Sequence, residues 1–129
     1  MAGIRRFEEI EAWQVARRLT KAVYGYSKKG SFAQDFGLKD QIRRAAVSVM
    51  SNIAEGFERE GAAEFSQFLA IAKGSAAEVR SQLYVALDQG HLTKTEFEEV
   101  FAMAESTRRL IAGFQKYLKS PKMRGQRFS

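Results

Sequence analysis

The chain has 129 residues, of which 45% are hydrophobic, 28% are charged and one is proline, a composition typical of one globular domain rather than a disordered chain. It contains no cysteine, which excludes a disulfide framework, a thiolate metal site and a cysteine nucleophile. The net charge of +6 lies at the two ends. Residues 1–30 hold seven basic and three acidic groups, residues 119–129 hold four basic groups and no acid, and residues 31–118 hold ten basic and twelve acidic groups.

Apolar residues recur at three- and four-residue spacing in four long segments, which predicts four helices and no sheet. The first helix is expected over about residues 8–29, because two lysines and then Gly30 form a typical helix end. The second begins between Asp35 and Leu38 and ends before Gly61. Its apolar residues at helical spacing predict a buried face.

The third helix is expected from Ala62 to Gln89 and contains Gly74. A mid-helix glycine costs about 1 kcal/mol, and we interpret this one as a site of close helix packing. Thr93 and Glu96 form a T-x-x-E capping box that predicts the start of the fourth helix. That helix ends shortly before Pro121, where proline no longer interrupts it.

The short connections make successive helices antiparallel neighbours. We therefore predict an all-α, antiparallel up-down-up-down four-helix bundle over residues 1–119 and a basic, disordered C-terminal tail over residues 120–129. The first helix then starts where the fourth finishes, and six cations gather at one pole of a nearly neutral body. These candidate nucleic-acid contacts are Arg5, Arg6, Lys119, Lys122, Arg124 and Arg127.

Polar residues form a continuous stripe on the second helix, and a second polar stripe lies on the third helix. We interpret the pair as a hydrogen-bonded and ion-paired seam that fixes helix register or a subunit contact, and we expect Arg44 or Gln41 near Glu78. A ligand site formed by the same groups is the alternative. The residues of the structural polar seam are Arg44, Ser48, Asn52, Glu55, Ser75 and Glu78.

The residue pattern contains no recognisable active site. His91 is the only histidine, and although Asp88 precedes it by three residues, a di-iron bundle requires two such pairs and further carboxylates. A nucleophile with an adjacent base is not assembled from one histidine and no cysteine. We therefore predict no catalytic residue, no cofactor and no metal ligand.

No apolar run approaches the roughly 20 residues that span a bilayer. Residues 1–11 contain three glutamates and lack the apolar segment of a secretory signal. We expect a cytoplasmic protein without a membrane partner.

Three ordered blocks resemble the signature segments of the four-helix-bundle proteins called 23S rRNA intervening-sequence proteins. The blocks are FEEIEAWQVARRL (7–19), QIRRAAVSVMSNIAEGF (41–57) and FLAIAKGSAAEVRSQL (68–83), and the resemblance extends over about residues 7–119. It implies a bacterial, cytoplasmic, ring-shaped homopentamer without a known activity. It also implies a distant likeness to the accessory proteins of diversity-generating retroelements, which bind nucleic acid and a reverse transcriptase.

The chain departs from this family pattern in two places. Met50 stands where many relatives have proline, so a kink in the second helix is expected to be weaker. Residues 30–33, Gly-Ser-Phe-Ala, replace a proline-containing turn and leave the shape of that loop open.

Three functional hypotheses follow. The leading one is a non-catalytic, oligomeric bundle that binds the backbone of RNA or DNA through the basic termini. The alternative is a structural or adaptor ring that binds a protein partner, with Trp13, Tyr24 and Tyr26 as exposed candidates. An enzyme with an unfamiliar site at the polar seam is the third.

Overall fold

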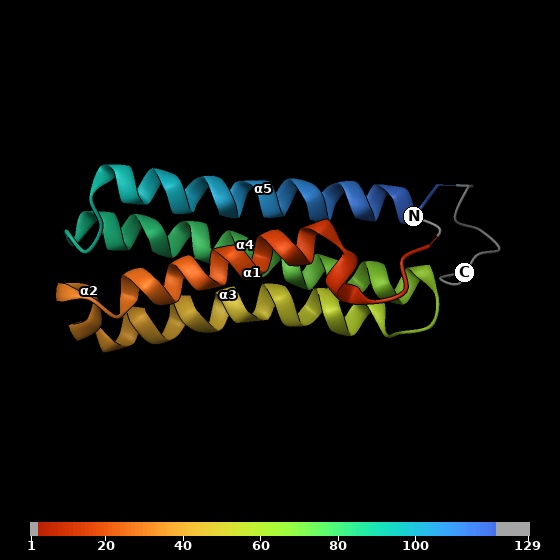
Figure 1. The fold of residues 1–129 in the computed structure, drawn as a ribbon, viewed down its shortest axis with the longest axis horizontal. Helices are drawn as coiled ribbons and strands as arrows, with labels where there is room; N and C mark the ends of the chain where they lie inside the picture. The colour runs from red at the N-terminus through yellow and green to blue at the C-terminus, as the bar shows by residue number, and fades with distance from the viewer. Residues whose placement is uncertain (1–2, 121–129) are drawn as a thin grey trace.

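The computed structural model describes residues 3–120, and all regular structure among them is helical. A 3-10 helix, η1 (Phe7–Glu9), precedes the α-helices. These are α1 (Glu11–Ser27), α2 (Gly30–Gln34), α3 (Phe36–Phe57), α4 (Ala62–Asp88) and α5 (Lys94–Leu118). The four long helices lie along one axis and make the bundle, whereas α2 is a short helix at one end (Figure 1). The predicted all-α class is confirmed.

Side-chain contacts between helices give their relative direction. Near the start of α4, the carbonyl of Ser66 accepts a hydrogen bond from Gln115, which lies near the end of α5. Further along α4, Arg80 pairs with Glu105, which lies earlier on α5. These two helices are therefore antiparallel. Figure 1 shows the same alternation along the chain, so that α1 begins at the end of the bundle where α5 finishes.

Two clusters of buried apolar side chains hold the bundle together, one towards each end. Helical spacing aligns these residues on one face of each helix, and their removal from water is the main stabilising contribution to the fold. The predicted inward face of the second helix is confirmed, because every member is at most 9% exposed. Its members are Leu38, Ile42, Ala45, Val49 and Ile53.

The prediction of one continuous helix over residues 8–29 is wrong at both ends. Phe7–Glu9 form the separate helix η1, the backbone of Ile10 is extended, and α1 starts at Glu11 and ends at Ser27. The interruption lets Ile10 place its side chain in the core, where it is 1% exposed. The helical periodicity does not reveal this break, because the core takes the side chain from an extended residue as well as from a helical one.

The loop whose shape the sequence left open is the helix α2. It begins at Gly30, whose φ of 56° favours glycine, and it buries Phe32 to 1% exposure. Asp35 then caps α3, because its Oδ1 accepts a hydrogen bond from the backbone N–H of Leu38 at 3.2 Å. The start of α3 at Phe36 lies within the predicted interval.

The predicted capping box of the last helix is confirmed. The hydroxyl of Thr93 accepts from the backbone N–H of Glu96 at 3.1 Å, and the Glu96 carboxylate accepts from the backbone N–H of Thr93 at 2.9 Å. Gly90, with φ 75°, makes the preceding turn. Within residues 3–120, none of the helices combines the length and hydropathy that a membrane span requires.

The interpretation of Gly74 as a close packing site is wrong. An added Cβ there meets no atom within 4 Å, because the residue is on an exposed face of α4. The close approach is instead at Gly56 on α3, where a Cβ would lie 2.7 Å from Cβ of Phe68. Sequence spacing does not distinguish these two glycines, because the distance to the neighbouring helix depends on how the helices are rotated.

Candidate functional site

Three of the six cations predicted to contact nucleic acid belong to the end of the bundle where the chain begins. Arg5, Arg6 and Lys119 are all exposed. Their sequence neighbours Ile4 and Tyr117 pack against the same buried cluster, which holds the first residues beside the last turn of α5. The other three cations, Lys122, Arg124 and Arg127, lie outside the described residues, as does the predicted tail from residue 121 onward.

The ion pairing at this pole is weak. Arg6 Nε lies 4.0 Å from Oε2 of Glu9, and both side chains are well exposed, so water screens the pair. The backbone N–H of Arg5 donates to the same carboxylate at 3.2 Å. The positive side chains therefore remain accessible to an anionic partner.

The structure brings together the uncharged members of the polar seam. Ser48 Oγ on α3 lies 2.8 Å from Ser75 Oγ on α4, and Ser75 is buried. The amide of Asn52 donates to the carbonyl of Ser48 at 2.8 Å and to its hydroxyl at 3.0 Å. This small network links α3 to α4 at mid-helix.

Two charged members of the seam, Arg44 and Glu55, pair with residues four positions away in the sequence. Arg44 lies 3.7 Å from Asp40, and Glu55 lies 2.6 Å from Arg59, each one helical turn away. Arg44 and Glu78 line one pocket of about 350 Å³, but within the described residues no ion pair joins them. The seam groups are thus neither all mutually paired nor closed off from solvent.

A second group of cations, which the sequence analysis did not select, lines a pocket of about 650 Å³ between α1 and α3. Arg17, Arg18 and Lys21 belong to it together with Trp13 of α1 and Met50 of α3. The four-residue spacing of Trp13, Arg17 and Lys21 on a helix was the signal that could have found this site.

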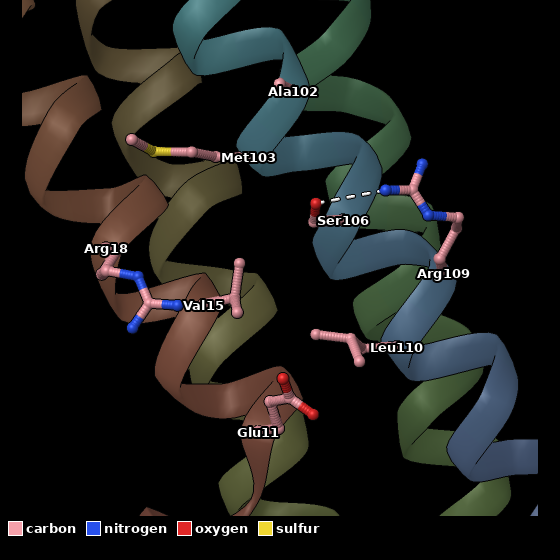
Figure 2. Close-up of a pocket in the computed structure, with 8 residues that line it drawn as sticks. All are labelled: Glu11, Val15, Arg18, Ala102, Met103, Ser106, Arg109 and Leu110. Carbon is pink, nitrogen blue, oxygen red and sulfur yellow. Dashed lines mark hydrogen bonds between the residues drawn. The ribbon is translucent and has the colours of Figure 1, made fainter.

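Another pocket, of about 520 Å³, lies between α1 and α5. Figure 2 shows Glu11, Val15 and Arg18 extending from α1 on one side and α5 side chains on the other. Arg109 donates to Ser106 Oγ at 3.3 Å within it. Opposite charges from Glu11 and the arginines give this pocket a mixed character, and Arg18 lines both pockets.

The structure also assembles a serine, a histidine and an aspartate, contrary to the expectation that no such arrangement forms. Ser31 Oγ lies 2.8 Å from His91 Nδ1, and His91 Nε2 lies 3.0 Å from Oδ2 of Asp35. A carboxylate only accepts hydrogen bonds, so in neutral His91 Nε2–H donates to Asp35 and Nδ1 accepts from Ser31. The imidazole stacks on buried Phe32, with ring centres 5.2 Å apart.

This trio fastens the α2 segment to the turn between α4 and α5. Asp35 is also the N-cap of α3, where it accepts from Leu38 N. The hydrogen bond from His91, followed by that from Leu38, holds the pKa of the Asp35 carboxyl below its ordinary value of 3.8. The carboxylate thus stabilises two connections of the fold at once.

Fold and surface together define the class of protein. It is a bundle of antiparallel helices, and among residues 3–120 no three His, Asp or Glu side chains gather as metal ligands. The chain belongs to the 23S rRNA-intervening sequence protein family, whose model matches residues 8–113. The resemblance carried by the three sequence blocks is therefore confirmed.

One solved structure supports the fold. The chain is similar to a protein of unknown function from the S23 ribosomal protein family of Bacteroides thetaiotaomicron, with a TM-score of 0.74 and 19% sequence identity. The similarity covers 81% of this chain and 98% of the other. At this identity the likeness concerns the fold alone. A comparison with curated proteins finds no significant match.

Proposed function

We propose that this protein is a non-catalytic, oligomeric helical bundle that binds the sugar–phosphate backbone of RNA or DNA. The observation that carries the proposal is the separation of charge. Residues 31–118 carry ten basic and twelve acidic groups, whereas the two ends supply the whole positive excess. Phosphate contacts by lysine and arginine are the main source of sequence-independent affinity for nucleic acid.

The exposure of Arg5, Arg6 and Lys119 at one pole supports this role. Lys122, Arg124 and Arg127 follow Lys119 within eight residues in the sequence and raise the net positive charge of this end of the chain. A ring of five copies, which the family resemblance implies, would multiply a weak basic patch into a strong one by effective concentration.

Two features support a non-catalytic protein. Asp35 is engaged as a helix cap, and the imidazole of His91 lies against buried Phe32, as expected of groups that stabilise the fold. The charged seam residues Arg44 and Glu55 form surface ion pairs with residues four positions away in the sequence. Catalytic groups instead converge on a site that positions a reacting atom.

The test is binding to fluorescent single-stranded RNA and DNA at two salt concentrations, with the molar mass measured by light scattering on the same sample. A pentamer that binds at low salt and releases at high salt is the expected result. Deleting residues 120–129 should weaken the salt dependence while the helical fold is retained. Absence of binding at low salt, or binding that does not change with salt, would overturn the proposal.

A protein-binding scaffold is the second candidate, and two exposed apolar side chains on α4 favour it. Tyr84 is 51% exposed and Val85 is 44% exposed, and the ring of Tyr84 lies 5.0 Å from that of Phe97. Two of the aromatic residues that the sequence suggested for partner binding are less accessible to a partner. Trp13 is half-buried, and the hydroxyl of Tyr26 donates a hydrogen bond to Glu99. Tyr24 is 39% exposed, with the Arg43 guanidinium 4.4 Å from its ring centre. A partner that remains bound after nuclease treatment of the lysate would favour this candidate.

A further inference from the structure

The groove between α1 and α3 has the composition of a binding site for a charged aromatic ligand. Its volume of about 650 Å³ lies in the range of small-molecule sites. Helix α1 supplies most of its lining, α3 supplies Met50, and η1 supplies Glu8. The groove therefore combines an aromatic ring and a thioether with several cations.

The cations of this groove lack the acidic partners found elsewhere on the molecule. Arg44 on α3, Arg59 in the turn after α3 and Arg80 on α4 each pair with a carboxylate. Within residues 3–120, neither Arg17 nor Lys21 has a carboxylate within ion-pair distance, and the same is true of the neighbouring Arg18. The three positive groups outnumber Glu8, the one carboxylate among the residues that line this groove, so the net charge of the groove is positive and favours an anion.

The indole of Trp13 is held in place by its neighbours. It packs against the core cluster near the start of α1 and meets the ring of Phe7 edge to face, with ring centres 5.2 Å apart. The Arg17 guanidinium lies over the indole ring, 5.9 Å from its centre, so a base would stack on the other face of the indole or displace this contact. A fixed aromatic ring beside an arginine is the arrangement on which single-stranded bases stack, because every base has a π face.

We infer that this groove binds one nucleotide unit of a single-stranded nucleic acid, with the base on Trp13 and the phosphates on Arg17 and Lys21. The inference rests on the proposed function and extends it, because Arg17 and Lys21 are not among the six cations at the pole to which that function assigns the phosphate contacts. Glu8 lies only two residues beyond Arg6 in the sequence, so the groove starts close to the basic pole. A strand that contacts the pole can continue along α1.

The chain contains one tryptophan, so its intrinsic fluorescence reports on this site directly. The full chain is titrated at low salt with a uridine decamer, an abasic decamer and uridine monophosphate, and anisotropy of labelled decamers gives the affinity. We expect the uridine decamer to quench Trp13, and the abasic decamer to bind at least about fivefold more weakly because stacking is lost. Equal affinity for uridine monophosphate would assign the groove to a free nucleotide and overturn the inference.

Two double variants with the same change in charge test the cations. Arg17→Gln with Lys21→Gln should weaken decamer binding about tenfold. The slope of log affinity against log salt concentration should become shallower by about 0.7 for each phosphate that is no longer neutralised. Lys28→Gln with Lys29→Gln removes two exposed lysines between α1 and α2, beyond the groove, and should change affinity much less. Circular dichroism verifies that both remain folded.

The outcomes separate this inference from the proposed function. A decamer that binds without quenching Trp13, and that binds both double variants equally, would overturn the inference and leave the basic pole as the binding site. A decamer that fails to bind the unmodified protein at low salt would overturn both.

Discussion

The hydroxyl of Tyr26, near the end of α1, donates a 2.5 Å hydrogen bond to Oε1 of Glu99, in the first half of α5. The two residues are 73 positions apart in the sequence, and they meet because α1 and α5 are antiparallel neighbours. The hydrogen bond favours the neutral phenol and, with some desolvation, raises the pKa of Tyr26 from 10.0 to about 12.

Ionisation of Tyr26 should therefore weaken the fold at high pH. Because the pKa is raised in the folded state, its contribution to stability is complete below pH 10.0 and is lost as the pH rises towards about 12. Ultraviolet titration should show one of the four tyrosines ionising near 12, and Tyr26→Phe should remove that component. Glu99→Gln should lower the pKa of Tyr26 towards its ordinary value of 10.0. An unchanged titration in that variant would contradict the assignment.

Asp35 should give the opposite pH dependence. The hydrogen bond with His91 lowers the pKa of the Asp35 carboxyl in the folded state. The contribution of this carboxylate to the stability of the fold is therefore present above pH 3.8 and is lost as the pH falls through the folded-state pKa. Asp35→Asn keeps a good helix cap and removes the charge. We expect this variant to be less stable than the unmodified protein near neutral pH, with a difference that disappears in acid. A difference in the free energy of unfolding that stays constant down to about pH 3 would show that the charge is not responsible.

Two glycines form a matched pair for testing helix packing. Gly56→Ala should lower the free energy of unfolding by about 1–3 kcal/mol, because its Cβ would lie 2.7 Å from Cβ of Phe68 and 2.8 Å from Cδ1 of Phe65. Gly74→Ala should raise it by about 0.5–1 kcal/mol, since the position is helical and open. Chemical denaturation of both variants measures whether the free energy of unfolding falls or rises. Equal effects of the same sign would refute the difference in packing at these positions.

The serine contact between α3 and α4 can be tested in the same way. Ser75→Ala removes the 2.8 Å hydrogen bond to Ser48 and should cost about 1 kcal/mol relative to Ser81→Ala. Ser81 lies exposed on the same helix, so the comparison cancels the higher helix propensity of alanine. If both variants have the same stability, the contact contributes nothing to the link between the helices.

The sequence predicted the helices more reliably than the side-chain contacts between them. Thr93 and Glu96 cap α5 as expected, because both partners of a capping box lie within one turn. Arg44 pairs with Asp40 on its own helix, and within the described residues no ion pair joins it to Glu78 on the next helix. The hydrogen bond from Ser31 to His91, 60 positions away, has no signature in either segment.

The sequence alone determined the helical class, the apolar faces and the family. Each of these depends on short-range spacing: 3.6 residues per turn aligns Ile42, Val49 and Ile53 whatever surrounds the helix. Only the tertiary structure decided that Gly56 approaches Phe68, and that Trp13 and Lys21 line one groove with Met50. Those relationships depend on the rotation and axial offset of whole helices, which the packing of all the buried side chains sets together.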